Sequence, residues 1–234
     1  MYLTDPRWSE NKRIGKIELE YKVALRPEEI AKMNPKQIGK RIQESLEYDD
    51  YEWQKERMIA YEGKKLAEHL EYALFMCPDC HSIGELHSED DLFRCKSCGY
   101  QVRYNVYGFF ELVEGSELFF DTVHSWNFWQ LDMMRQQVKK AKRKKQEEAI
   151  FSDMNLNLLK GYKTQLPKKF LKGNASLYYD RLEIRSKNNE SLEFEITKID
   201  GTNVQVNEVL EFYYQDVLYR FEFEDIVSAY KYMR

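Results

Sequence analysis

The chain has 234 residues, with 36 Lys and Arg against 40 Asp and Glu, so its formal net charge is −4. Charged residues make up 32% of it, and its mean hydropathy is −0.71. No apolar run approaches the roughly 20 residues that a membrane-spanning helix needs, so the sequence argues against an integral membrane protein. The length suits two small domains. The opening residues lack the features of a signal peptide, and we expect a cytoplasmic protein with reduced thiols.

The first predicted element is a strand over residues 15–25. Ile17, Leu19, Tyr21 and Val23 alternate there with charged residues, as in a strand with one apolar face. A strand of this kind would be an unpaired edge, prone to pair with a partner sheet.

Residues 26–76 are predicted to form a helical unit. Pro27 and Pro35 each stand where a helix begins, and the second helix carries an apolar stripe. Two more helices are expected, over residues 51–59 and 64–75. The apolar residues of the second and last of these helices are Ile38, Ile42 and Leu46, and Leu66, Leu70 and Leu74.

Four cysteines follow with C-x2-C spacing in each of two pairs, and the chain has no others. They are Cys77, Cys80, Cys95 and Cys98. Two such pairs supply the tetrahedral sulfur set that zinc prefers, so residues 77–121 are predicted to be a zinc ribbon. Four cysteines close the coordination shell, and the Zn²⁺ is therefore expected to be structural. His81 and His87 are alternative ligands, but the pattern favours solvated loop histidines.

After a strand at residues 101–104, residues 109–123 are expected to be irregular or strand-like. Residues 122–149 are predicted to form a linking helix that Ser125 caps. Its aromatic first half passes into a basic end, which suits an anionic membrane surface or, more simply, a solvated end joining two domains. The candidate lipid-binding residues are Lys139, Lys140, Lys142, Arg143, Lys144 and Lys145.

Residues 150–234 read as a β domain. Its strands alternate apolar and polar residues, with turns expected at residues 188–189, 200–201 and 215–216 and a closing helix from Asp225. The predicted fold class is α+β, in which a helical unit with a zinc ribbon precedes a small antiparallel PH-like or GRAM-like domain. Lysines gather in its first hairpin, as a lipid-facing or simply solvated surface: Lys160, Lys163, Lys168, Lys169 and Lys172.

The sequence contains no recognisable catalytic motif. Its four histidines form no triad pattern, and its 10 glycines form neither a Walker loop nor a dinucleotide fingerprint. No catalytic residue is therefore predicted.

The residue runs 2–9, 13–17, 61–63, 67–71 and 126–130, together with the two cysteine pairs, resemble bacterial 1-acyl-glycerol-3-phosphate acyltransferases. The similarity is to the type with a C-terminal zinc ribbon and covers roughly the first 130 residues. It implies that residues 1–25 correspond to the end of an acyltransferase domain, whose reaction transfers an acyl chain to lysophosphatidic acid.

The family's catalytic H-x4-D motif is absent. The residues at the aspartate position after the four histidines are Leu74, Leu86, Leu92 and Trp129. The substrate-binding E-G-T-R stretch is also missing, because Lys64 follows Glu62-Gly63 and Ser116 follows Glu114-Gly115. The resemblance therefore implies an accessory or regulatory portion of such an enzyme, without catalysis of its own.

The expected partner is an acyltransferase catalytic domain or another protein, with a peripheral position at an anionic inner membrane face as a further expectation. A nucleic-acid-binding or protein-interaction ribbon is the alternative. Acidic residues between the cysteine pairs disfavour nucleic acid, because a ribbon that grips phosphate needs cations there. They are Glu85, Glu89, Asp90 and Asp91.

Overall fold

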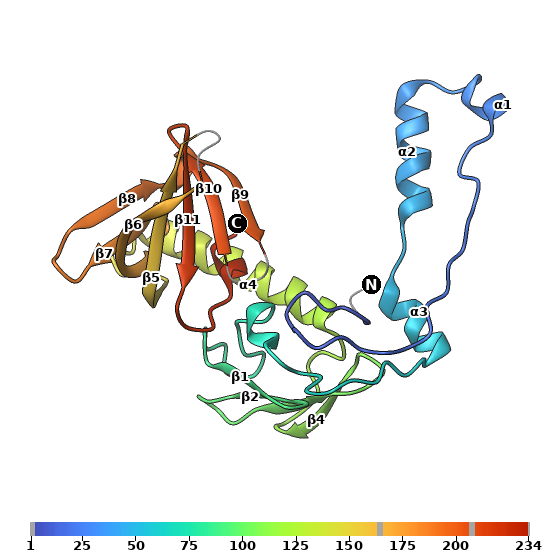
Figure 1. Ribbon diagram of the computed structural model, residues 1–234, viewed down its shortest axis with the longest axis horizontal. Helices are drawn as coiled ribbons and strands as arrows, with labels where there is room; N and C mark the ends of the chain where they lie inside the picture. Colours follow the sequence, from blue (N-terminus) through green and yellow to red (C-terminus); the bar gives the residue numbers. More distant parts are fainter. Residues whose placement is uncertain (1–2, 163–165, 206–208, 234) are drawn as a thin grey trace.

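The computed structural model describes residues 3–162, 166–205 and 209–233. It has two antiparallel sheets and a few helices, which confirms the α+β class (Figure 1). The small sheet has the strand order β1-β2-β3-β4, and the large sheet has the order β8-β7-β6-β5-β11-β10-β9.

Residues 15–49, which we name the arm, project from the body of the molecule (Figure 1). The expected strand at residues 15–25 is not formed. This segment is extended, but beside it there is only an isolated bridge between Ile14 and Glu62. A strand needs a neighbour to receive its backbone hydrogen bonds, and the described residues offer none here.

The arm also contains α1 (Pro27–Ile30) and α2 (Pro35–Leu46) and leads into α3 (Asp50–Arg57). Asn34 caps α2 by accepting from the Gln37 backbone N–H, while the Gln37 side chain accepts from the Asn34 N–H. This capping box explains why α2 begins where the proline predicts. Neither α1 nor α2 buries a residue.

The expected helix at residues 64–75 was wrong. Turns replace it, with one 3₁₀ turn η1 (Leu70–Tyr72). Two amides that a helix would use are bonded outside the segment, because the Ala67 N–H donates to the Asp90 carbonyl and the His69 N–H donates to Ser88 Oγ, and the bonds within the segment close short turns. The apolar residues that suggested a helix are nevertheless buried at Leu66, Leu70 and Leu74.

The small sheet consists of β1 (Leu86–Glu89), β2 (Leu92–Cys95), β3 (Gln101–Tyr104) and β4 (Phe110–Glu114). The last strand lies in the segment expected to be irregular or strand-like. Aromatic rings from the strands pack around Trp126, which is fully buried. Trp8 joins this core, and the Arg13 guanidinium lies 4.8 Å from the Tyr104 ring centre. The residues before the arm thus pack with the small sheet.

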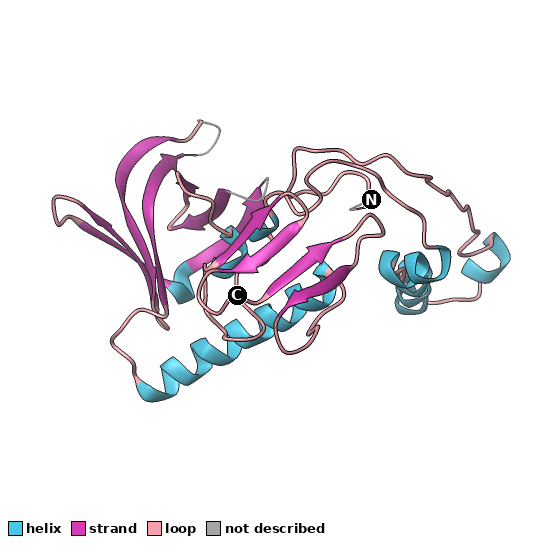
Figure 2. Ribbon diagram, turned by 90° about the horizontal axis from the view of Figure 1, so that it is seen from below, coloured by secondary structure: helices cyan, strands magenta, loops and turns pink. Residues whose placement is uncertain are grey.

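The long helix α4 (Val123–Lys144) runs along the small sheet and reaches the large one (Figure 2). Thr122 is its cap instead of Ser125, because Thr122 Oγ1 accepts from the Ser125 N–H at 3.1 Å. Met134 on α4 packs with Phe75 and Met76, in a cluster that also touches Phe151 of the large sheet. This cluster joins the two sheets.

The large sheet wraps around its own core, in which Phe194, Phe212 and Phe221 are buried. Its first strand pairs with its last. The strands are β5 (Phe151–Gly161), β6 (Lys168–Leu177), β7 (Arg181–Ser186), β8 (Ser191–Glu195), β9 (Ile199–Gln205), β10 (Val209–Tyr214) and β11 (Val217–Phe223), with a 3₁₀ turn η2 (Ile196–Lys198) before β9.

Two of the three expected turns are confirmed. Asn189 lies in the β7–β8 turn, and Gln215 and Asp216 form the two-residue β10–β11 turn, all with positive φ. The turn expected at residues 200–201 was wrong, because both residues belong to β9. Gly201 has φ +60° and lies where the pairing of β9 with β10 is irregular, so this glycine allows a β-bulge in place of a turn. Lys163 lies outside the described residues.

The chain ends in a 3₁₀ turn, η3 (Ala229–Tyr232), and the closing α-helix expected from Asp225 was wrong. The segment is too short to repay helix nucleation, and its contacts with the rest of the molecule fix another geometry. Ala229 and Tyr232 are buried in the large core, while Ser228 Oγ donates to the Tyr72 carbonyl at 2.7 Å. Across the described ranges, no helix combines the length and the apolarity needed to cross a bilayer.

Candidate metal centre

The two cysteine knuckles, residues 77–80 and 95–98, have the same backbone geometry. In each, the residue after the second cysteine donates its N–H to the carbonyl of the first, from His81 to Cys77 at 3.1 Å and from Gly99 to Cys95 at 3.0 Å. His81 has φ 59° and Gly99 has φ 85°. Glycine enters this left-handed region at little cost, which explains Gly99. His81 adopts the same conformation despite the steric cost that its Cβ imposes there.

A second bond repeats as well. The N–H of Cys77 donates to the Ser82 carbonyl at 3.0 Å, and the N–H of Cys95 donates to the Tyr100 carbonyl at 2.8 Å. The two knuckles are therefore pseudo-symmetric hairpin turns that face one another. Such turns aim both sulfurs of a pair in one direction, which is what two facing pairs need to surround an ion.

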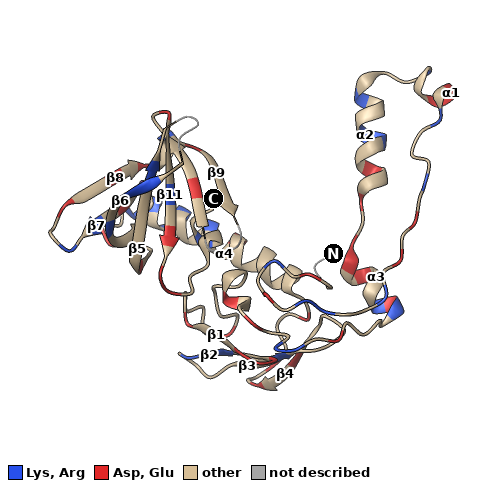
Figure 3. Ribbon diagram, in the orientation of Figure 1, with Lys and Arg blue, Asp and Glu red and all other residues tan. Residues whose placement is uncertain are grey.

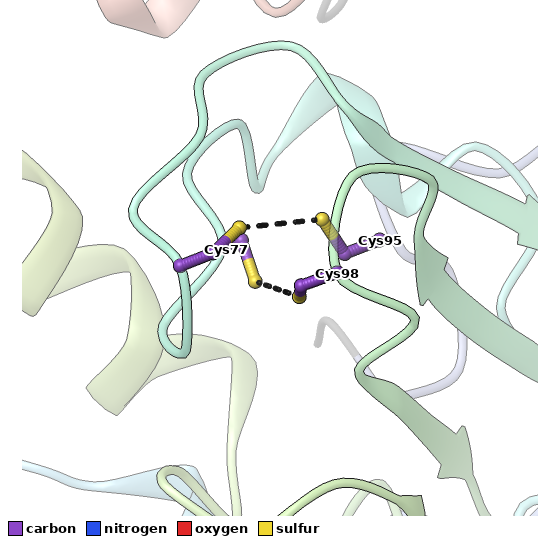
Figure 4. A group of neighbouring side chains, drawn as sticks. Cys77, Cys95 and Cys98 are labelled. Atoms are coloured by element: carbon purple, nitrogen blue, oxygen red, sulfur yellow. Dashed lines mark hydrogen bonds between the residues drawn. The ribbon is translucent and has the colours of Figure 1, made fainter.

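The structure brings together all four cysteines expected from the sequence (Figure 4). Their Sγ atoms lie within 4.8 Å of one another, with 3.6 Å between Cys77 and Cys98 and 3.7 Å between Cys80 and Cys95. Four sulfurs placed tetrahedrally at bonds of about 2.3 Å would lie about 3.8 Å apart. This arrangement can hold a metal ion, and four cysteine sulfurs are a donor set that suits an ion such as zinc.

The electrostatics of the site also favour a cation. Burial raises the pKa of the Cys77 thiol, and it raises that of Cys98 to about 11. At Cys80 burial acts in the same direction, but hydrogen bonds from Ser82 prevail and lower the pKa to about 6. Four thiolates this close repel one another, so all four ionise together only around a positive ion.

Residues from α4 hold the chain that enters the first knuckle. Gln130 is fully buried, and its Oε1 accepts from the backbone N–H groups of Phe75 at 2.8 Å and Met76 at 3.3 Å. Its Nε2 donates to the Ala73 carbonyl, and one turn earlier Trp126 Nε1 donates to the Met76 carbonyl at 2.9 Å. Sequence reasoning missed Gln130. The only available signal was a polar residue four positions after a tryptophan on the apolar side of the helix.

The histidines considered as alternative ligands do not join the sulfur cluster. The His81 ring lies 5.4 Å from the Trp129 ring, and His87 Nδ1 lies 3.5 Å from a Glu71 carboxylate oxygen. Among the described residues, the cysteine cluster is the one group with metal-ligand spacing.

The six expected lipid-binding residues lie together at the C-terminal end of α4, the last of them at its cap, and all six are exposed (Figure 3). Ala141 is the buried member of this stretch. The basic end therefore faces solvent while one edge of the helix stays packed.

No protein-family model, curated protein or solved structure matches this chain.

Proposed function

We propose that the four cysteines bind a structural Zn²⁺ and that residues 77–121 form a zinc ribbon. The observation that carries this proposal is the set of four sulfurs, which fills a tetrahedral coordination shell and leaves no position open for chemistry. Zinc binding at such sites contributes folding free energy on the order of 10 kcal/mol. The ion would therefore fasten β2 to the chain before β1.

Metal analysis tests this assignment. We expect one zinc per chain, which is lost in Cys95→Ser and retained in His87→Ala. The histidine variant is the matched control, because His87 lies on the neighbouring strand but outside the cluster. A chain that folds without stoichiometric metal, or that loses it equally in both variants, would refute the proposal.

We further propose that the chain is an accessory or regulatory portion of a glycerophospholipid-synthesis acyltransferase and is not catalytic alone. The supports are the resemblance of its first residues and ribbon to that family and the missing H-x4-D motif. The large sheet, with seven strands around one core and a final turn packed into it, supports a PH-like domain.

An acyl-transfer assay with lysophosphatidate and an acyl thioester tests the catalytic part. The chain alone is expected to show no transfer, and a separately purified acyltransferase catalytic domain is expected to bind it. Transfer by the chain alone that disappears in His69→Ala or His124→Ala would overturn the proposal, as would the absence of binding to any such domain.

A second candidate activity is contact with an anionic membrane surface. Lys160 and Lys168 stand directly opposite one another on β5 and β6, where like charges repel. Leu166 and Phe170, on the same hairpin, are 85% and 54% exposed. Lysines beside exposed apolar side chains suit a charged lipid interface.

Sedimentation with anionic and neutral vesicles separates this activity from simple solvation. We expect binding to anionic vesicles alone, weakened in Lys168→Glu and unchanged in Lys187→Glu, which alters an exposed lysine at another hairpin. Equal partitioning into both kinds of vesicle would exclude recognition of lipid charge. Filter binding across a salt series addresses nucleic acid, for which we expect no affinity.

A further inference from the structure

The arm, residues 15–49, presents a strand-like segment and a helix whose apolar side chains nothing in the described chain covers. Leu19, Tyr21 and Val23 are 78%, 91% and 75% exposed. On α2, Ile42 and Leu46 lie in an exposed apolar stripe. The helix has a complete capping box, so it is locally encoded even though it buries nothing.

The root of the arm is fixed to the body. Ile14 exchanges backbone hydrogen bonds with Glu62, and the Tyr61 hydroxyl donates to the Lys16 carbonyl at 3.1 Å. Beyond this point the backbone of the extended segment makes no ladder. The segment therefore leaves the body in the right conformation for pairing, with the pairing groups unused.

The charges along residues 17–25 favour a second copy of the same segment as the partner, and they favour one antiparallel register. If two copies pair antiparallel about Tyr21, the Glu20 of each copy lies opposite the Lys22 of the other, which gives two pairs of opposite charge. Pairing about Glu20 also sets Glu18 opposite Lys22, but it adds two facing glutamates, and pairing about Lys22 adds two facing lysines. Opposite charges across strands stabilise pairing and like charges oppose it, so the register about Tyr21 is favoured.

The same register also matches the apolar residues. Leu19 lies opposite Val23 and Ile17 lies opposite Leu25, all on the face that carries Tyr21. A two-stranded ribbon is marginal by itself, but a helix on its apolar face stabilises it. The exposed stripe of α2 supplies that cover from each copy.

We propose that the arm is a dimerisation element, in which residues 17–25 of two copies form an antiparallel ribbon about Tyr21 that the two α2 helices cover. The inference goes beyond the proposed function. A paired arm leaves the cysteine site and the large sheet available to an acyltransferase domain, so dimerisation and that interaction are separately measurable.

Analytical ultracentrifugation of the full chain over a concentration series tests the proposal. Wild type is expected to be a dimer. Glu20→Lys places lysines against Lys22, and Lys22→Glu places glutamates against Glu20, so each variant alone is expected to dimerise about tenfold more weakly or worse. Mixing the two variants restores opposite charges across the strands and is expected to give a heterodimer of wild-type strength.

Glu18→Lys is the matched control. In the register about Tyr21, Glu18 faces Ala24, so this variant is expected to dimerise like wild type. In a register about Glu20 it would face Lys22 and weaken the dimer. A specific dimer would form well below about 100 µM, so a wild-type chain that is still monomeric at that concentration overturns the proposal. So does a mixture of the charge variants that stays monomeric. A monomer that still binds an acyltransferase domain would leave the proposed function standing.

Discussion

Gln130 shows how one buried side chain ties a helix to the cysteine site. Its carboxamide serves three backbone groups of residues 73–76, so replacement leaves buried N–H groups without partners. We predict that Gln130→Leu lowers the free energy of unfolding by about 2 kcal/mol or more and weakens retention of the metal.

The control is Gln136→Leu on the same helix, whose exposed side chain donates a hydrogen bond to the exposed Asp132. Its effect is expected to stay within about 0.5 kcal/mol in urea titrations. Equal losses in the two glutamine variants would mean that Gln130 has no specific role in holding the first knuckle.

Tyr100 carries a pH dependence at the residue scale. Burial raises its pKa from 10.0 to about 12. Because the folded-state pKa lies above the unfolded value, the neutral hydroxyl contributes stability that is complete below about pH 10 and is lost as pH rises towards 12. We predict that the free energy of unfolding of wild type falls more steeply above pH 10 than that of Tyr100→Phe. Parallel curves for the two proteins would contradict the assignment.

At the scale of elements, η3 is fastened to β5 by a buried ion pair. Lys231 is 3% exposed, and its Nζ lies 2.6 Å from Asp153 Oδ1, while the Tyr232 hydroxyl donates to the other carboxylate oxygen. Burial lowers the pKa of Lys231, and Asp153 opposes that shift. The charge is therefore tolerated because its partner is fixed.

We predict that Lys231→Met lowers the free energy of unfolding by about 3–5 kcal/mol, because it leaves the Asp153 carboxylate buried without its cation. The double variant Asp153→Leu with Lys231→Met should recover much of that loss in a double-mutant cycle. Lys198→Met, which removes an exposed ion pair with Glu195, serves as the control and should change little. A Lys231 variant as stable as this control would show that the pair does not hold η3.

Elements whose determinants are local in sequence could be predicted. The cysteine cluster follows from C-x2-C spacing, α2 follows from its proline and capping residues, and the two-residue β10–β11 turn follows from Gln215-Asp216. The helix and the turn depend on contacts within a few residues, and each C-x2-C pair is equally local, although the two pairs meet across 15 to 21 residues.

The wrong predictions depend on distant contacts. Residues 64–75 have helical apolar spacing, but the hairpin of β1 and β2 accepts the amide hydrogen bonds of Ala67 and His69, so the segment forms turns instead. The final segment also has helical spacing, yet contacts with Tyr72 and Asp153 hold it in a 3₁₀ turn. Residues 15–25 alternate like a strand and are extended, but no ladder forms without a neighbouring strand. Apolar spacing reports which residues are buried more reliably than which hydrogen bonds form.

At the scale of the whole molecule, two cores are joined by the Phe75, Met76 and Met134 cluster. Removing the metal should loosen the first core, because the knuckles hold β2 against the chain that enters β1. We predict that a chelator raises amide hydrogen exchange at residues 74–104, while η3 and the strands of the large sheet stay protected. Uniform loss of protection, or none at all, would contradict the separation of the two cores.

Helix α4 has 22 residues, and at 1.5 Å each it is about 33 Å long. Its first turns are embedded beside the sulfur cluster, and its last turn carries the exposed cations. Because no proline interrupts it, the helix is expected to be stiff and to keep these two points at a fixed separation. Any anionic partner bound at the basic end of α4 would be held at a constant distance from the cysteine cluster. Fluorophores at the two ends of the helix should therefore show a single narrow distribution of energy-transfer efficiency.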